Sequence, residues 1–278
     1  MKPFSLNIKG RLIEYDRPLV MGIVNVTPDS FFCGSRALAQ LDVSRRVERM
    51  ITEGVDIIDL GGVSTRPGAR QVSEYEEFDR LHTGLKGIRD VSEDIPVSVD
   101  TYRTSIARPV VEKYGADIIN DISGGTMDPE MFDTIASLRV PYILMHMRGT
   151  PQTMQSMTDY TDVTAEVVTD LSRKLRELRL KGVADVIIDP GFGFAKTAEQ
   201  NFSLLKNLSA LSSELSAPIL VGMSRKSMLT KTLDIEPEDA LNATTVVNTI
   251  ALMQGASILR VHDVRPAAEA VKLFSLTC

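Results

Sequence analysis

Short apolar runs alternate along this chain with longer segments in which apolar residues recur every three or four positions. The runs are nearly continuous in Val, Ile and Leu, which is typical of strands buried on both faces of a parallel sheet. A short start, in which residues 5–10 and 11–16 flank a Gly turn, predicts a β-hairpin. Eight further strands are expected within residues 19–26, 55–61, 96–100, 116–123, 141–146, 184–190, 217–224 and 257–263.

The segments between the strands have the spacing of amphipathic helices. The clearest lies near residues 161–181, where Val163, Val167, Leu171, Leu175 and Leu178 recur between charged residues and Gly182 follows. This stripe predicts packing against a core rather than a partner site. The polar stretch 148–162, after the fifth buried strand, is interpreted as a loop at the top of the fold.

Eight β/α repeats within 278 residues predict a closed (β/α)₈ TIM barrel with a short N-terminal β-hairpin. No linker interrupts the series, so residues 1–278 are expected to form a single domain. A doubly wound open sheet is the alternative architecture.

Composition and charge exclude some classes of binding partner and cellular environment, but they do not indicate a reaction. A net charge of −6 and a pI near 5.2 argue against a nucleic-acid surface, which needs a basic stripe. The start of the chain lacks the apolar run of a signal peptide, and no stretch is long enough for a membrane span. Cys33 and Cys278 are the only cysteines, which favours a reducing cytoplasm over a disulfide framework.

Nearly every predicted strand ends in a polar residue, and active sites of such barrels lie at that end. An Asp at one strand end is often only a helix cap, but a cap does not explain the whole set. The residues are Asn25, Asp59, Asp100, Asn120, Asp121, His146, Asp189, Arg225, Lys226, Arg260 and His262.

The chemistry of this set suits an aminopyrimidinone ring. Asp100, Asn120 and Asp189 offer acceptors to the amino and ring N–H groups of a pterin or guanine. Lys226 supplies a donor for a carbonyl oxygen, and the flat guanidinium of Arg260 is suited to stack on a heteroaromatic face.

A second group of residues suits a magnesium diphosphate. Asn25 offers an amide oxygen to a hard cation, whereas the three scattered histidines have no zinc-site spacing. Donors to phosphate oxygens are Thr65, Arg66, Arg260 and His262.

Other strand-end features have simpler interpretations. Ser227 lies where a helix is expected to begin. It could bind an anion at the helix N-terminus or serve only as the N-cap. Gly191 and Gly193 are interpreted as backbone turns beside Asp189, and His146 as a core residue.

Seven motifs, in order along the chain, resemble those of the dihydropteroate synthase family. They are NVTPDSF (25–31), STRPGA (64–69), SVDT (98–101), NDISG (120–124), DPGFGF (189–194), SRKS (224–227) and RVHDV (260–264). The resemblance extends from Met21 to Val264. It implies a transferase that joins a dihydropterin carrying a CH₂–diphosphate to 4-aminobenzoate, with loss of pyrophosphate, in folate synthesis. In this family sulfonamides compete for the aminobenzoate site.

The resemblance also implies roles for individual residues. The pterin would be bound by Asp100, Asn120, Asp189, Lys226 and Arg260, the diphosphate by Thr65, Arg66, Arg260 and His262, and the aminobenzoate by Phe31, Pro67, Lys226 and Ser227. Asn25 would be the ligand to Mg²⁺, and the reaction itself would depend on Asp100, Lys226, Arg260 and His262. A homodimer through barrel helices is implied as well.

Two positions depart from the family pattern. In the first loop, family members often have an Asp near the position of Cys33, and in the second loop Val63 stands where a Glu is frequent.

Two rival functions remain: a methyltetrahydrofolate-binding methyltransferase, and a pterin-binding protein without catalysis. The STRPGA and RVHDV segments count against the first, and Asn25, Arg66 and Lys226 against the second.

Overall fold

The strands lie close to the positions that the sequence predicts. The computed structural model describes residues 3–26, 36–64 and 70–277. A hairpin is formed by β1 (Phe4–Ile8) and β2 (Arg11–Tyr15). Eight strands follow: β3 (Leu19–Asn25), β4 (Ile57–Gly61), β5 (Val97–Asp100), β6 (Ile118–Asp121), β7 (Tyr142–Met145), β8 (Val186–Asp189), β9 (Leu220–Val221) and β10 (Ile258–Val261).

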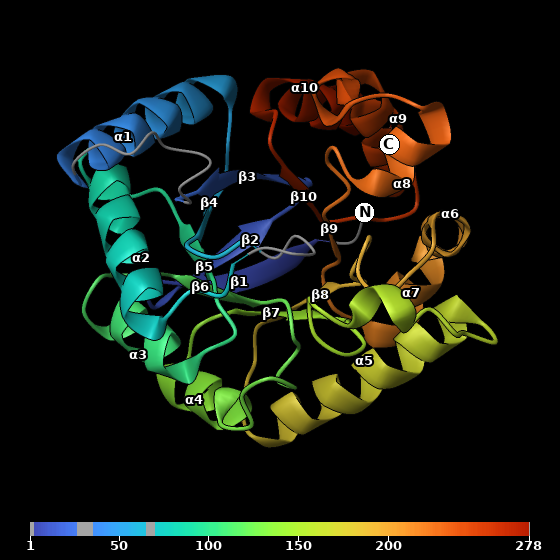
Figure 1. Cartoon of the computed structure of the whole chain (residues 1–278), viewed down its shortest axis with the longest axis horizontal. Helices are drawn as coiled ribbons and strands as arrows, with labels where there is room; N and C mark the ends of the chain where they lie inside the picture. Colours follow the sequence, from blue (N-terminus) through green and yellow to red (C-terminus); the bar gives the residue numbers. More distant parts are fainter. Residues whose placement is uncertain (1–2, 27–35, 65–69, 278) are drawn as a thin grey trace.

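Helices follow each of these eight strands and form a ring outside them (Figure 1). They are α1 (Arg36–Glu53), α2 (Glu74–Arg89), α3 (Thr104–Glu112), α4 (Met131–Leu138), α5 (Val163–Leu180), α6 (Ala198–Lys206), α7 (Leu208–Leu215), α8 (Ser227–Leu233), α9 (Leu241–Met253) and α10 (Val264–Ser275). Two short 3₁₀ turns are η1 (Met154–Ser156) and η2 (Pro237–Asp239). None of the helices in the described ranges is long and apolar enough to cross a membrane.

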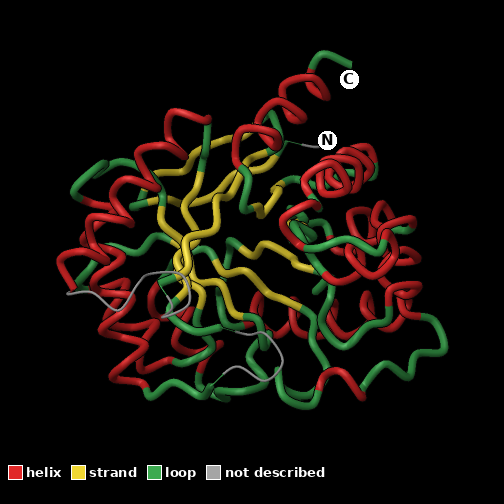
Figure 2. The backbone as a smooth tube through the Cα atoms, turned by 45° about the horizontal axis from the view of Figure 1, so that its top comes forward, coloured by secondary structure: helices red, strands yellow, loops and turns green. Residues whose placement is uncertain are grey.

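The sheet closes on itself, which confirms the (β/α)₈ barrel and excludes the open-sheet alternative. All neighbouring strands in the order β8-β7-β6-β5-β4-β3-β10-β9 are parallel. A parallel bridge between Ile188 and Ile219 joins the two ends of that order, and the Ile188 amide donates to the Pro218 carbonyl at 2.9 Å. Figure 2 shows the strands as an inner layer surrounded by helices.

Strand β9 is much shorter than the predicted run 217–224. Only Leu220 and Val221 pair regularly with β10, and contact with β8 is limited to the single bridge. The Ser257 hydroxyl accepts the Ile219 amide at 3.3 Å, so this donor is not available to a regular strand ladder. The closing seam of the barrel therefore rests on few backbone bonds.

Alternation along the strands separates two apolar layers. Successive strand residues point to opposite faces, so residues two apart share a face. One set packs between the strands and the helices, as Val20 and Ile58 do. The other set fills the barrel interior: Leu19, Met21, Ile57, Ile118, Ile143, Ile187, Leu220 and Ile258.

The N-terminal hairpin contributes to the interior layer. Leu6 and Ile8 of β1 are buried in the same cluster, and β1 and β2 lie across the centre of the helix ring in Figure 1. Lys9 and Gly10 both have positive φ, 52° and 75°, as a tight two-residue hairpin turn requires. The predicted hairpin is confirmed, and it covers apolar side chains at the amino-terminal ends of the strands.

Helix α5 matches the predicted amphipathic segment. It begins after Asp162, whose carboxylate accepts the amides of Thr164 and Ala165 at 2.9 and 3.0 Å. All five residues of the predicted apolar stripe are buried. The stripe is core packing, as expected.

A buried hydrogen bond outside the barrel interior fixes the loop after β6. Asp121 points to the helix side, accepts the amides of Ser123 and Gly125 at 2.7 and 2.8 Å, and accepts the Tyr142 hydroxyl at 2.7 Å. Burial raises the pKa of Asp121 above its ordinary value. Asp121 is therefore a structural residue of the loop and does not belong to the ligand-recognition set.

We predict that Tyr142→Phe lowers the free energy of unfolding by about 1–3 kcal/mol, because the buried Asp121 carboxyl loses a donor. Tyr160→Phe is the matched control, since among the described residues no partner bonds its buried hydroxyl. It should change stability little. Urea unfolding of both variants measures the difference, and equal losses would contradict this account of Asp121.

Candidate active site

Polar side chains replace apolar ones in the last interior layer of the barrel. Asp59 follows Ile57 on the interior face of β4, and Asn120 follows Ile118 on that of β6. The same two-residue spacing places Asn25, Asp100, Asp189, Arg260 and His262 on the interior side of their strands. The structure thus brings these predicted residues together at the carboxyl ends of the strands.

Arg260 links two carboxylates of this layer. Its Nε donates to Asp59 at 2.7 Å, and its NH2 donates to Asp100 at 3.1 Å. Asn120 donates its side-chain amide to both Asp59 oxygens at 3.3 Å. Asp59 is fully buried, and the guanidinium is mostly buried, so each charge is compensated within the protein.

The surroundings of Asp100 make it titrate near neutrality. Burial raises its pKa to about 7; Arg260 opposes the shift, and the negative charge of Asp59 adds to it. A carboxyl with a raised pKa holds a proton in the folded state at a pH where the unfolded chain has released it. Its contribution to stability therefore decreases as the pH rises toward 7.

Asp189 and Lys226 are held by the same glycine-containing loop. Asp189 accepts the Gly191 amide at 2.7 Å, and burial raises its pKa, which Lys226 opposes. Lys226 donates to the Phe192 carbonyl, and its ammonium lies 4.6 Å from the centre of the Phe194 ring. Burial lowers the pKa of Lys226 to about 8.

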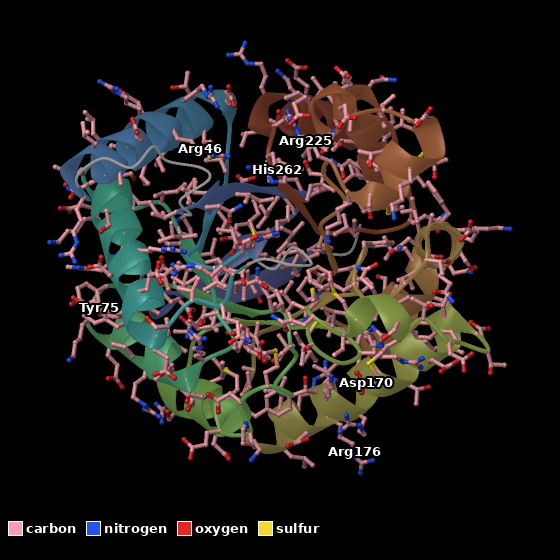
Figure 3. The ribbon with its side chains drawn as sticks, viewed as in Figure 1. Arg46, Tyr75, Asp170, Arg176, Arg225 and His262 are labelled. Carbon is pink, nitrogen blue, oxygen red and sulfur yellow. The ribbon has the colours of Figure 1, made fainter. Side chains whose placement is uncertain are left out.

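His262 is neutral and its ring is held by Ser224. Burial, with Arg260, Arg46 and Arg225, lowers its pKa to about 4. The Ser224 hydroxyl accepts the His262 backbone amide at 3.2 Å and lies within hydrogen-bond distance of Nδ1, at 3.1 Å. Figure 3 shows Arg46 and Arg225 near His262.

Asn25 presents an amide oxygen beside a glycine. A Cβ at Gly61 would lie 2.8 Å from the Asn25 Oδ1, so the absence of a side chain there leaves room for that oxygen. In the described part of the chain, no group of three or more His, Cys, Asp or Glu side chains is arranged for a metal. Since Mg²⁺ is usually held by one or two protein oxygens together with phosphates and water, a single amide oxygen is compatible with it.

Other strand-end residues have structural contacts. Arg225 forms a two-bond ion pair with Asp263 at 2.8 and 2.9 Å, and His146 is 2 % exposed. Gly191 and Gly193 have φ of 71° and 78°, which confirms them as turns. Ser227 is the exposed first residue of α8, and Lys226, not Ser227, occupies the N-cap position.

Several expected site residues lie outside the described residues. They are Phe31, Thr65, Arg66 and Pro67, together with Cys33. Their roles remain predictions. The described members of the diphosphate set are therefore Arg260 and His262, and those of the aminobenzoate set are Lys226 and Ser227.

The sequence assigns no role to two residues that contact the predicted site residues, Asp59 and Ser224. Asp59 was recognised as a strand-end residue but given no role, although it bonds both Arg260 and Asn120. Its place two residues after Ile57, in register with the other interior polar residues, was the available signal. Ser224 belongs to the SRKS motif, but its contact with His262 joins residues 38 apart and has no local signal.

Comparison with known proteins agrees with this arrangement. A family model described as "Pterin binding enzyme" matches residues 21–262. The dihydropteroate synthase of Synechocystis is 44% identical over 260 residues, which cover 92% of this chain and 89% of the relative.

Two solved structures share the fold over nearly the full chain. A Xanthomonas albilineans dihydropteroate synthase with 4-aminobenzoic acid has a TM-score of 0.90 at 36% identity, covering 99% of this chain and 98% of the other. A Burkholderia cenocepacia enzyme complexed with 7,8-dihydropteroate has a TM-score of 0.86 at 37% identity, covering 99% and 96%.

A buried polar layer and full-length similarity together define a pterin-binding barrel enzyme. Within that class, the chain belongs to the dihydropteroate synthase family.

The Arg260 contacts predict opposite pKa changes at Asp100. Asp59→Asn removes a negative charge and should lower the pKa of Asp100, whereas Arg260→Met removes the opposing cation and should raise it. Carbon-13 NMR titration of the Asp100 carboxyl measures both shifts.

Asp56→Asn is the control, because Asp56 precedes the same strand β4 at its other end and pairs with Arg17. It should leave the Asp100 titration unchanged. Shifts of the same sign in Asp59→Asn and Arg260→Met would refute the electrostatic account.

Proposed function

We propose that this chain makes 7,8-dihydropteroate at the polar layer above its barrel interior. In this reaction the methylene carbon of (7,8-dihydropterin-6-yl)methyl diphosphate is transferred to the amine of 4-aminobenzoate, and pyrophosphate leaves. The observation that carries the proposal is one set of polar residues at one end of a family barrel, made of buried Asn120 and Asp189 and half-buried Asp100, Lys226 and Arg260. Similarity to dihydropteroate synthases over the full chain favours this reaction over methyl transfer from a folate.

The pterin would be recognised at its edge by acceptors and at its carbonyl by a cation. Asp189 and Asn120 are 7 % and 3 % exposed, so a donor that reaches them meets little competing water. Lys226 opposes the raised pKa of Asp189 more than any other cation does, and it would donate to the carbonyl oxygen. Ionised Asp100 would accept a further N–H group.

Arg260 is suited to stacking because its edge is already occupied. Bonds to Asp59 and Asp100 use its Nε and NH2 donors, which fix the guanidinium plane. A fixed plane can lie against a flat heteroaromatic ring without further ordering. Its charge would also act on the diphosphate.

The diphosphate would be held by donors on several loops. We assign the ring proton of His262 to Nε2, with Nδ1 accepting from Ser224, so that Nε2–H would donate to a phosphate oxygen. Thr65 and Arg66 are proposed for the same ligand. Asn25 would hold Mg²⁺, which, when bound, would offset charge on the phosphate oxygens.

The aminobenzoate would lie next to Lys226 and the exposed Ser227, with Phe31 and Pro67 from the preceding loops. Electron donation from the dihydropterin ring assists departure of the diphosphate, which takes the carbon–oxygen bonding pair. The amine lone pair then forms the carbon–nitrogen bond, and the nitrogen loses a proton. Positioning of the weak amine nucleophile would be the main task of the protein.

The direct experiment supplies both substrates with Mg²⁺ and measures dihydropteroate by chromatography. Product should form, should fall to background when EDTA removes the cation, and should return with added Mg²⁺. No product under any of these conditions would refute the proposed reaction, and unchanged turnover in EDTA would refute the magnesium requirement alone.

Asp189→Asn should weaken pterin binding by about 2–5 kcal/mol, because an amide must place a donor against a donor of the ring. Calorimetric titration with 6-hydroxymethyl-7,8-dihydropterin provides the measurement. Asp185→Asn is the control, since Asp185 lies before β8 at the opposite end of the strand and accepts the Asn7 amide. Equal affinity of Asp189→Asn and the parent protein would rule out this role.

The homodimer is proposed to form through α9 and α10. Helix α9 contains no charged residue, and Val246 and Met253 on it are 51% and 74% exposed. A surface groove beside them is lined by Leu241, Leu252, Leu273 and Phe274, among others. An uncharged helix with exposed apolar side chains on the outside of a barrel favours burial against another chain.

Sedimentation of the parent protein should then give a dimer, and Val246→Asp should give a monomer, because the charge would be buried at the interface. Leu180→Asp on α5 is the control, since Leu180 is 80% exposed on a different part of the barrel. It should remain a dimer. A monomeric parent protein would contradict the proposed homodimer.

Cytoplasmic function is proposed from the two cysteines, Cys33 and Cys278, which are far apart in the sequence and suit a reducing compartment.

A further inference from the structure

A buried lysine behind the active-site loop has no role in the reaction described above. Lys196 lies directly before Thr197, the N-cap of α6, and is 8% exposed. Its ammonium donates to the carbonyls of Gly191 and Phe194 at 2.9 and 3.1 Å. It also lies 3.1 Å from Nδ1 of His146. The charge of a lysine this buried normally needs compensation, and here acceptors of the loop 189–194 and His146, directly after β7, provide it.

The number of acceptors matches the number of donors. An ammonium group has three N–H donors and no acceptor, and Lys196 faces three acceptors. Burial lowers the pKa of His146, and the positive charge of Lys196 lowers it further. The imidazole is therefore neutral. Its Nδ1 lone pair then accepts from Lys196, and its proton lies on Nε2. All three donors are used only while the amine is protonated.

The loop that Lys196 holds carries the pterin-recognition groups. Its Gly191 amide donates to Asp189, its Phe192 carbonyl accepts from Lys226, and its Phe194 ring lies against the Lys226 ammonium. The loop also packs closely on β7, because a Cβ at Gly191 would lie 1.9 Å from the His146 carbonyl oxygen. Displacement of this loop would move Asp189 and Lys226 together.

We propose that Lys196 is a positioning residue for the pterin site: its ammonium clamps the loop 189–194 against His146 and so fixes Asp189 and Lys226. The inference rests on the proposed assignment of these two residues to the pterin. Lys196 itself lies behind the loop carbonyls and is not proposed to touch the substrate.

The clamp should depend on pH. Burial lowers the pKa of Lys196 to about 7; Asp189 opposes this shift, and Lys226 and Arg148 add to it. His146 also faces the amine, and Asp170 and Lys174 of α5 lie behind His146; Asp170 is labelled in Figure 3. Because the neutral amine has one donor fewer, the clamp weakens as the pH rises above about 7.

The test compares Lys196→Met with the parent protein by titration with 6-hydroxymethyl-7,8-dihydropterin. At pH 6 the dissociation constant of Lys196→Met should be at least about tenfold higher, because charge-assisted hydrogen bonds to the loop are lost. The ratio of the two constants should fall as the pH rises to about 8.5, since the parent protein then loses its own clamp. Taking this ratio removes the titration of Asp100, which both proteins share, because Lys196 is not among the charges that shift it.

Lys174→Met is the matched control. Lys174 is 3% exposed and pairs with Asp170 at 2.9 Å, but in the described part of the chain it forms no hydrogen bond or ion pair with the loop 189–194. Its replacement should lower the melting temperature and leave pterin affinity within about twofold. A ratio below twofold for Lys196→Met at pH 6, a ratio constant with pH, or an equal effect of Lys174→Met would overturn the clamp.

If Lys196→Met does not fold, His146 supplies the same test. His146→Asn keeps an acceptor near the position of Nδ1, whereas His146→Leu removes it. Pterin affinity should fall at least about fivefold in His146→Leu and less than about twofold in His146→Asn. Equal affinities of the two variants would overturn the proposal. Binding of the pterin to the parent protein reports separately on the proposed function.

Discussion

The ion pairs of Arg260 are the interaction on which the polar end of the barrel depends. A guanidinium enclosed by protein needs negative charge near it, and Asp59 and Asp100 provide that charge on two neighbouring strands. The two carboxylates repel each other, so neither the cation nor the anions are stable there alone. One consequence is the raised pKa of Asp100. The cluster ties β4, β5 and β10 together at the end where catalysis is proposed.

This polar layer is possible because the layers beneath it are apolar and closed. Interior Ile, Leu and Met residues fill the barrel below the polar layer, and the N-terminal hairpin covers the opposite end with Leu6 and Ile8. Water is therefore excluded from one side of Asp59 and Asn120, which strengthens their electrostatic interactions. Because water is excluded, a buried polar group without a hydrogen-bond partner would destabilise the fold. This explains why Asp59 and Asn120 are both hydrogen-bonded.

The loops around the site are fixed from behind rather than from within it. Asp121 and Tyr142 hold the loop after β6 from the helix side, and Ser224 holds the ring of His262. Lys196 and His146 hold the loop after β8. In each case a buried polar group outside the ligand-facing layer holds a loop or side chain of that layer in place. Such support from behind is common where the geometry of an active site has to be maintained.

The sequence by itself determined the order of strands and helices, because apolar runs buried on both faces and helical stripes such as that of α5 are local patterns. It also determined which residues end the strands, and with them the class of ligand. Only the tertiary structure decided the partners of those residues. Asp59 and Arg260 are 201 positions apart, and no local pattern distinguishes the inward Asn120 from the outward Asp121 until the strand register is known. The short β9, the contact of Ser224 with His262 and that of Lys196 with His146 also arise from groups distant in sequence, since burial and hydrogen bonding act between neighbours in space.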